Sequence, residues 1–143
     1  MNNKAYLSFL SQSSNVSLAR MAVTTFASEL GFTLSELEEI KVAISEAVTN
    51  SIIHGYPENQ GIVDIEMELE DNSLHVIISD YGQGIDDIEE VKKPAYSTKD
   101  EHMGLGLAFI DSFMDQTVID SQPGEGTVIK MMKTPETMKK AVD

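Results

Sequence analysis

The sequence feature that most constrains the fold is a strict alternation of apolar and acidic residues over positions 63–70. The apolar members are Val63, Ile65, Met67 and Leu69, and the acidic ones are Asp64, Glu66, Glu68 and Glu70. Successive side chains of a strand point to opposite faces of its sheet, so this segment predicts a strand with one buried side and one wet side. The chain should therefore contain a sheet that is covered on one face only.

Helical periodicity precedes this strand. Apolar residues recur at three- and four-residue steps over 14–30, which is typical of an amphipathic helix. Thr33 and Glu36 have the spacing of a capping box and predict the start of a second helix, because each side chain can bond the other's main-chain amide. Gly55, in a left-handed conformation, and Pro57 predict where that helix ends.

Further strands and a third helix complete the pattern. Residues 4–10 and 74–80 read as strands, 105–114 as a helix that begins directly after glycines, and 117–132 as a closing hairpin. Between them, residues 81–103 read mostly as a loop, with a helical turn expected near residues 86–91. The order β-α-α-β-β-loop-α-β-β predicts an α+β two-layer sandwich, in which a mixed, mostly antiparallel sheet carries its helices on one face.

Length and charge narrow the class of protein. The chain has 143 residues, so we expect one domain over 1–133 and a poorly ordered tail over 134–143. Its formal net charge of −14 repels a phosphate backbone and disfavours direct binding of nucleic acid. No apolar run reaches the ~18 residues of a membrane span. The absence of cysteine excludes disulfides and thiolate chemistry. We expect a cytoplasmic protein.

Glu46 and Asn50 are the first candidate site residues. They lie four positions apart in the second predicted helix, so they project from the same face. Asparagine is a poor helix former because its side chain competes for main-chain hydrogen bonds, so its place inside a helix asks for a reason. Taken alone, the pair is explained as well by an ordinary polar face.

Asp80, Gly82 and Gly84 form a second candidate, directly after a predicted strand. A carboxylate at a strand end can accept hydrogen bonds from a ligand, and glycines let a ligand approach the main chain closely. Ordinary turn chemistry accounts for the same residues, so this signal is weak on its own.

Gly104-Leu105-Gly106 forms a third candidate at the start of the third predicted helix. Exposed amides and the positive end of the helix dipole favour phosphate there, although glycines also cap and hinge helices. Thr98 and Lys99 offer a hydroxyl and a cation in the preceding loop, whose length is typical of functional or disordered loops.

In their order along the chain, these motifs and Thr127 on a late strand resemble the ATPase fold shared by the gyrase, Hsp90, histidine kinase and MutL families. A more specific resemblance lies in residues 45–55, 80–84 and 96–99. They resemble the anti-sigma serine kinases of spore-forming bacteria, in particular those that regulate the sporulation sigma factor, sigma F. The similarity runs from about residue 4 to residue 133.

The resemblance implies ATP and Mg²⁺ as cofactors. Asn50 would bind a Mg²⁺ that bridges the phosphates, and one side-chain carbonyl suffices because Mg²⁺ usually keeps waters and phosphate oxygens as its other ligands. Asp80 would accept the adenine amino group, and Thr127 would help to hold the base. The remaining nucleotide-binding residues that it implies are Gly82, Gly84, Thr98, Lys99, Gly104, Leu105 and Gly106.

The resemblance also implies a reaction and partners. Glu46 would be the general base that deprotonates a serine of an anti-anti-sigma factor, and phosphoryl transfer otherwise needs mainly positioning and charge stabilisation. The protein would bind and inhibit sigma F. Arg20, the sole arginine, would anchor both partners through its planar guanidinium. A homodimer is implied as well.

Three alternatives stay open. One is a stress-response anti-sigma kinase of the same fold, and another is a non-catalytic nucleotide-sensing module that binds partners. The presence of Glu46 beside Asn50 argues against the second. A histidine kinase catalytic domain is the third, but none of His54, His75 and His102 lies in a helical phosphoacceptor module.

Overall fold

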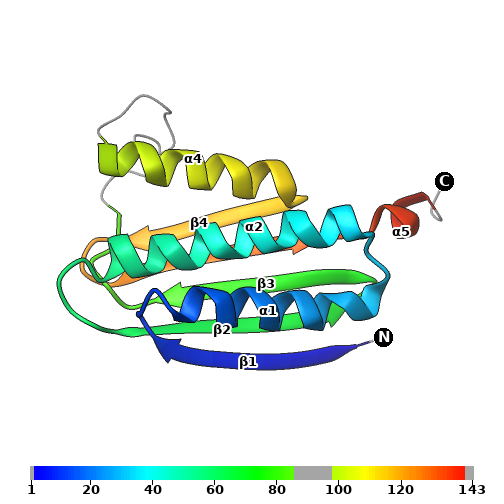
Figure 1. The fold of residues 1–143 in the computed structure, drawn as a ribbon, viewed down its shortest axis with the longest axis horizontal. Coiled ribbons are helices and arrows are strands. Elements are labelled where there is room, and N and C mark those ends of the chain that lie inside the picture. The colour runs from blue at the N-terminus through cyan, green and yellow to red at the C-terminus, as the bar shows by residue number, and fades with distance from the viewer. Residues whose placement is uncertain (1, 86–97, 141–143) are drawn as a thin grey trace.

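The computed structural model describes the backbone of residues 2–85 and 98–140, and the side chains of residues 2–85 and 105–139. In chain order the elements are β1 (Asn3–Leu10), α1 (Asn15–Ala27), η1 (Ser28–Leu30), α2 (Leu34–Asn50), η2 (Ser51–Gly55), β2 (Ile62–Glu70), β3 (Ser73–Asp80), α4 (Thr98–Phe113), β4 (Gln116–Gln122), β5 (Gly126–Lys133) and α5 (Glu136–Lys140). The strands form one sheet, and α1, α2 and α4 lie along one of its faces (Figure 1). This arrangement confirms the predicted two-layer α+β sandwich.

The sheet has five strands in the order β1-β2-β3-β5-β4, and each neighbouring pair is antiparallel. The expectation of a mixed sheet is therefore wrong. β3 and β4 run in the same direction, but β5 lies between them and pairs antiparallel with both. The β3–β5 register places Asp80 opposite Thr127, so two predicted site residues are neighbours across the sheet.

The alternation in β2 separates the two faces of the sheet as predicted. The four apolar side chains are at most 4% exposed, and they are Val63, Ile65, Met67 and Leu69. They face the buried side of the helices, which includes Ala19, Val23, Ile40, Ile44, Ala47 and Ile110. Burial of this apolar surface is the main force that holds the helical layer on the sheet.

The start of α2 follows the predicted capping box. The Glu36 main-chain N–H donates to Thr33 Oγ1 at 3.1 Å, and the Thr33 N–H donates to Glu36 Oε1 at 2.9 Å. At its other end α2 continues as one wide π-helical turn, η2. Gly55 closes that turn without a positive φ, so the predicted left-handed end is wrong. No helix among residues 2–85 and 98–140 is long and apolar enough to cross a membrane.

The third predicted helix begins earlier than expected. α4 starts at Thr98 rather than at Leu105, so Gly104 and Gly106 lie inside it and do not open it. The segment that precedes Gly104 has no apolar periodicity from which a helix could be predicted. The expectation that Gly104 opens this helix is therefore wrong, and the phosphate-binding role of Gly104 and Gly106 stays a prediction. The predicted helical turn near residues 86–91 lies outside the described residues.

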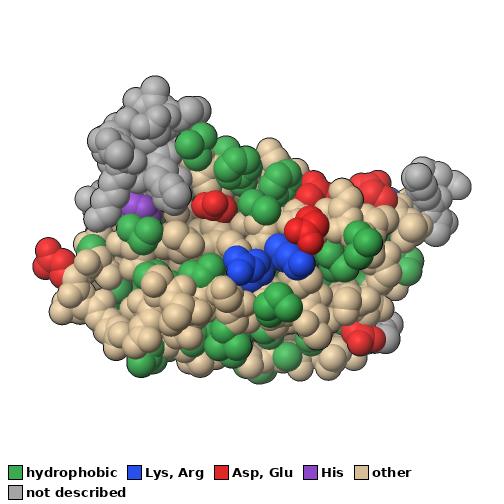
Figure 2. Space-filling model, in the orientation of Figure 1, with side chains coloured by type: hydrophobic (Ala, Val, Ile, Leu, Met, Phe, Trp, Pro, Cys, Tyr) green, Lys and Arg blue, Asp and Glu red, His purple; other side chains and the backbone are tan. Residues whose placement is uncertain are grey.

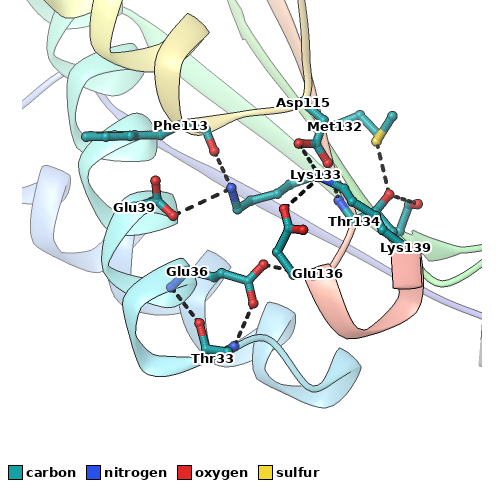
Figure 3. Close-up of polar contacts among 11 residues, drawn as sticks. Thr33, Glu36, Glu39, Phe113, Asp115, Met132, Lys133, Thr134, Glu136 and Lys139 are labelled. Carbon is teal, nitrogen blue, oxygen red and sulfur yellow. Dashed lines mark hydrogen bonds and ion pairs between the residues drawn. The ribbon is translucent and has the colours of Figure 1, made fainter. Parts of the chain in front are cut away.

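The C-terminal segment is more ordered than predicted. Pro135 is fully buried, and the Glu136 N–H donates to Glu36 Oε2 at 3.0 Å, which docks α5 on the start of α2 (Figure 3). Lys139 Nζ lies 2.8 Å from Asp115 Oδ1. The expectation of a poorly ordered tail is therefore wrong for residues 134–140, because these contacts hold the segment. Residues 141–143 lie outside the described part.

Candidate functional site

One cavity lies where the C-terminal end of α2, the end of β3, α4 and β5 meet. It brings together three predicted site residues, Asn50, Asp80 and Thr127. Its other lining residues are Ser51, His54, Gly55, Ile85, Leu107, Ile119 and Ile129. The lining thus combines a few polar side chains with apolar ones, which is the composition typical of sites for a ligand with an apolar body and a few polar groups.

Asp80 is the charged group of the cavity lining. It ends β3 and is 3% exposed, and its Oδ1 accepts the Gly82 N–H at 3.0 Å. Burial raises the pKa of Asp80 above its ordinary value, although bonds from the Gly82 N–H, the Ser51 hydroxyl and the Thr127 N–H oppose that shift. A buried carboxyl acceptor of this kind can recognise an amino group on a ligand.

Three glycines let the main chain close tightly around Asp80. A Cβ on Gly55 would lie 2.8 Å from Asp80 Oδ1, and one on Gly82 would lie 1.9 Å from the Gly55 carbonyl oxygen. Gly84 has φ +77°, and its Cβ would lie 2.3 Å from the Gln122 carbonyl oxygen. A side chain at Gly82 or Gly84 would clash with the main chain of the protein, so both positions require glycine even without a ligand. Gly55 is required because a side chain there would clash with Asp80, not because of its φ.

Thr127 is held by hydrogen bonds within the closing hairpin. Its Oγ1 lies 2.7 Å from Ser121 Oγ, which also accepts the Ile85 N–H at 2.7 Å. Ser121 and Ser51 are site residues that sequence reasoning missed. Counting back from the hairpin turn places Ser121 opposite Thr127, so the hairpin register would have found it.

Glu46, Asn50 and Gly106 come together where α2 faces α4. A Cβ on Gly106 would lie 2.7 Å from Glu46 Oε2 and 3.5 Å from Asn50 Nδ2. Gly106 thus allows α4 to approach both polar side chains of α2. Glu46 is half-buried and does not line the cavity, but it lies beside the part of it that Asn50 forms.

Asn50 stands out among the buried polar groups. It is 6% exposed, and neither Oδ1 nor Nδ2 has a hydrogen-bond partner in the part of the chain that the structure describes. Leaving a buried amide unbonded costs about 1–3 kcal/mol per group. Its carbonyl oxygen is the hard donor that Mg²⁺ prefers, so this orphaned amide fits the predicted metal role.

The other predicted residues lie apart from this cavity or outside the description. Leu105 is 47% exposed and does not line the cavity, although it belongs to α4. Thr98 and Lys99 form the first turn of α4, and their side chains lie outside the described residues. Their expected lid contacts therefore stay predictions.

Arg20 lies on the helical layer, outside the cavity. From α1 its guanidinium donates to Ser17 Oγ at 3.0 Å and to Ser45 Oγ of α2 at 3.2 Å. In Figure 2, basic side chains lie at the centre of this layer, with an acidic side chain directly beside them and apolar side chains around them. Arg20 is half-buried and oriented by two serines, and one of these immediately precedes Glu46.

Comparison with known proteins identifies the family. Residues 9–133 match the model of the histidine kinase-like ATPase domain. The anti-sigma F factor of Bacillus subtilis is 46% identical over 136 residues, which cover 93% of this chain and 93% of that protein. The one from Clostridium acetobutylicum is 44% identical over 135 residues, covering 93% and 94%.

Solved structures agree on the fold. The RsbU and RsbW domains of a Mycobacterium tuberculosis protein match with a TM-score of 0.67 at 18% identity, over 92% of this chain and 32% of theirs. These findings confirm the predicted class, an anti-sigma factor on an ATP-binding domain in a family of ATP-dependent serine kinases. The chain belongs to the anti-sigma F factors, a family built on the histidine kinase-like ATPase domain.

Proposed function

We propose that this protein is a cytoplasmic anti-sigma factor that binds sigma F and uses Mg-ATP to phosphorylate a serine of an anti-anti-sigma factor. The observation that carries the proposal is the Asn50 amide, which has no hydrogen-bond partner among the described residues and shares one cavity with the Asp80 carboxyl. One group suits a metal-bound phosphate and the other suits an adenine amino group. Glu46 lies beside Asn50, at the end of the cavity where the phosphates would be.

The residues divide between binding and chemistry. Asp80 accepts a hydrogen bond from the amino group of the base, and Thr127 helps to hold the base from the neighbouring strand. Asn50 supplies an oxygen ligand to Mg²⁺, which neutralises phosphate charge when it is bound with ATP. Gly106 leaves the room that these groups need between α2 and α4.

The transfer step needs one proton acceptor. A bond forms between the substrate serine Oγ and the γ-phosphorus, while the bond from that phosphorus to the bridging oxygen of ADP breaks. Glu46 accepts the proton that the serine hydroxyl loses. Because Glu46 is half-buried rather than sealed in the core, a serine from another protein can reach it.

Partner binding is proposed for the helical layer around Arg20. The guanidinium is already oriented by Ser17 and Ser45, so a partner carboxylate can bind it without further ordering of the side chain. Both sigma F and the anti-anti-sigma factor would use this residue, and the protein would act as a homodimer. The relatives that match are anti-sigma F factors, which favours the sporulation role over the stress-response alternative.

The test is incubation with γ-labelled ATP, Mg²⁺ and the anti-anti-sigma protein. We expect label on a serine of that protein, stable to brief acid treatment because phosphoserine is a phosphoester. Acid-labile label, or label confined to this chain, would support the histidine kinase alternative. Nucleotide binding without any transfer would support the non-catalytic module.

A further inference from the structure

We propose that Tyr56 is a positioning residue for nucleotide recognition, because its hydroxyl fixes the segment Asp80–Gln83 that carries the base-binding carboxyl. The inference rests on the proposed binding of adenine by Asp80. Tyr56 does not line the cavity, so it acts through the main chain beside it.

The Tyr56 hydroxyl joins two main-chain segments. It donates to the Ile62 carbonyl oxygen at 2.7 Å and accepts the Tyr81 N–H at 2.7 Å. Ile62 begins β2, and Tyr81 directly follows Asp80. The β2–β3 pairing ends at Val63 and Asp80, and this one side-chain oxygen adds a bridge directly beyond that last pair.

The contacts around this hydroxyl leave little freedom. The Gln83 N–H donates to the Gly55 carbonyl oxygen at 2.9 Å, so the residue before Tyr56 holds the same segment. The Tyr56 ring covers Gly61 so closely that a Cβ there would lie 2.2 Å from Cε1 of the ring. The ring is thus fixed on one side, and its hydroxyl is aimed at the main chain of Tyr81.

The chemistry of the hydroxyl suits a permanent bond. Burial raises the pKa of Tyr56, with the nearby charges of Asp80 and Asp64 adding to that shift. The hydroxyl therefore stays protonated at neutral pH and remains able to donate to Ile62. If it is removed, the Tyr81 N–H loses its acceptor, and the main chain that directly follows Asp80 can shift to find another.

The decisive variant is Tyr56→Phe, which removes the hydroxyl and keeps the ring. We expect the Kd for ATP to rise about five- to tenfold, the size of one lost hydrogen bond of this kind. Phosphoryl transfer at saturating ATP should be unchanged, because Glu46 does not line the cavity and the Asn50 side chain makes no hydrogen bond with the described residues. Tyr6→Phe is the matched control. Tyr6 is 70% exposed, and its hydroxyl bonds Glu66 Oε1 on β2, so its loss should leave the Kd for ATP unchanged.

A second readout separates positioning from general support of the fold. Inosine triphosphate has a carbonyl where ATP has the amino group, so a well-placed Asp80 should discriminate against it. We expect Tyr56→Phe to lose most of the wild-type preference for ATP, with the Kd for inosine triphosphate changing less than about twofold. An equal loss for both nucleotides, unchanged binding of both, or a variant that is unfolded at 25 °C would each overturn the positioning role. If the wild-type protein itself shows no preference for ATP, the assignment of Asp80 in the proposed function fails instead.

Discussion

The two ends of α2 differ in whether their buried polar groups are hydrogen-bonded. At the N-terminal end, the Glu36 carboxylate accepts main-chain N–H groups from Thr33 and Glu136, and the Lys133 ammonium donates to a carbonyl at the end of α4 (Figure 3). At the C-terminal end, the Asn50 amide is buried with no partner among the described residues. The helix has 17 residues, so these ends lie about 25 Å apart.

From this difference we propose that the N-terminal end of α2 stabilises the protein and that its C-terminal end binds a ligand. Satisfied buried groups add to the free energy of unfolding, whereas an unsatisfied one lowers it until something binds. We therefore expect substitutions at the first end to change stability with little effect on activity. Substitutions at the second end should change activity with little loss of stability.

Glu46→Gln should give the largest effect. The amide keeps the size of the side chain but cannot accept a proton as a carboxylate does, so we expect the transfer rate to fall by about 10²-fold or more. The Kd for ATP should stay within about twofold, since Glu46 does not line the cavity. Single-turnover transfer with labelled ATP measures this, and a near-normal rate would mean that the base lies elsewhere.

Asn50→Ala should remove the metal-dependent part of ATP binding. We expect the affinity for Mg-ATP to fall by more than about tenfold, while binding measured in EDTA changes little. The free energy of unfolding should not decrease, because the lost amide makes no hydrogen bond with the described residues. Calorimetry with and without Mg²⁺ measures the affinity for ATP, and urea unfolding measures the stability. Equal loss with and without the metal would contradict the assignment.

Arg20→Ala tests a surface that belongs to neither end. Loss of such a binding residue commonly costs about 2 kcal/mol or more, so both partners should bind roughly thirtyfold more weakly. ATP affinity should not change, because Arg20 lies outside the cavity. Arg20→Lys should rescue only part of the loss, since an ammonium lacks the planar fork. Unchanged affinity for both partners would leave Arg20 as an ordinary helix residue.

Lys133→Met should lower stability and spare the chemistry. Lys133 is 7% exposed and lies 3.8 Å from Glu39 Oε1 while it caps the end of α4. Methionine keeps the apolar stem and leaves that carbonyl without its donor, so the free energy of unfolding should fall by about 1–3 kcal/mol. Lys41→Met is the control, because Lys41 makes an exposed ion pair of small energy. Urea unfolding measures the loss of stability. A folded variant with a much reduced transfer rate would contradict the expected difference between the two ends of α2.

The sequence predicted those parts of the fold that depend on local signals. The alternation over 63–70 and the capping box of Thr33 each act through neighbouring residues, so the pattern alone was sufficient. The early start of α4 was missed because its first turns lack an apolar stripe. The docking of α5 was missed because it depends on the second oxygen of Glu36, whose partner is 100 residues away.

The same distinction applies to the candidate site. Asn50, Asp80 and Thr127 were found through motifs, and the structure places them in one cavity. Ser51 and Tyr56 were not, because their relation to Asp80 exists only once the end of α2 lies beside the end of β3. Ser121 was also missed, although the register of the closing hairpin places it opposite Thr127. The catalytic role of Glu46 and the metal role of Asn50 remain predictions.

Glu36 and Asp80 sharpen the comparison through pH, since their pKa values shift in opposite directions. Burial alone would raise the pKa of Glu36, but the Thr33 and Glu136 N–H bonds and the nearby Lys133 charge hold it below its usual 4.5. A depressed folded pKa means that the ionised Glu36 stabilises the fold above pH 4.5 and that this stability is lost as the pH falls through the folded value. For Asp80 the folded pKa is raised, so ionisation destabilises the fold as the pH rises from the ordinary 3.8.

The smallest expected effect is therefore a difference in how the free energy of unfolding changes with pH. At pH 7 Glu36→Gln should be less stable than the wild-type protein by about 1 kcal/mol, because the amide nitrogen faces a main-chain donor where an oxygen accepted before. That gap should narrow below pH 4.5, when the wild-type carboxyl takes up its proton. Asp80→Asn should show the opposite trend. Its free energy of unfolding should increase relative to that of the wild-type protein as the pH rises above 3.8. Urea unfolding at several values between pH 3.5 and 7 measures both gaps. A gap for Glu36→Gln that stays constant over this range would show that the two carboxyls do not differ as their surroundings require.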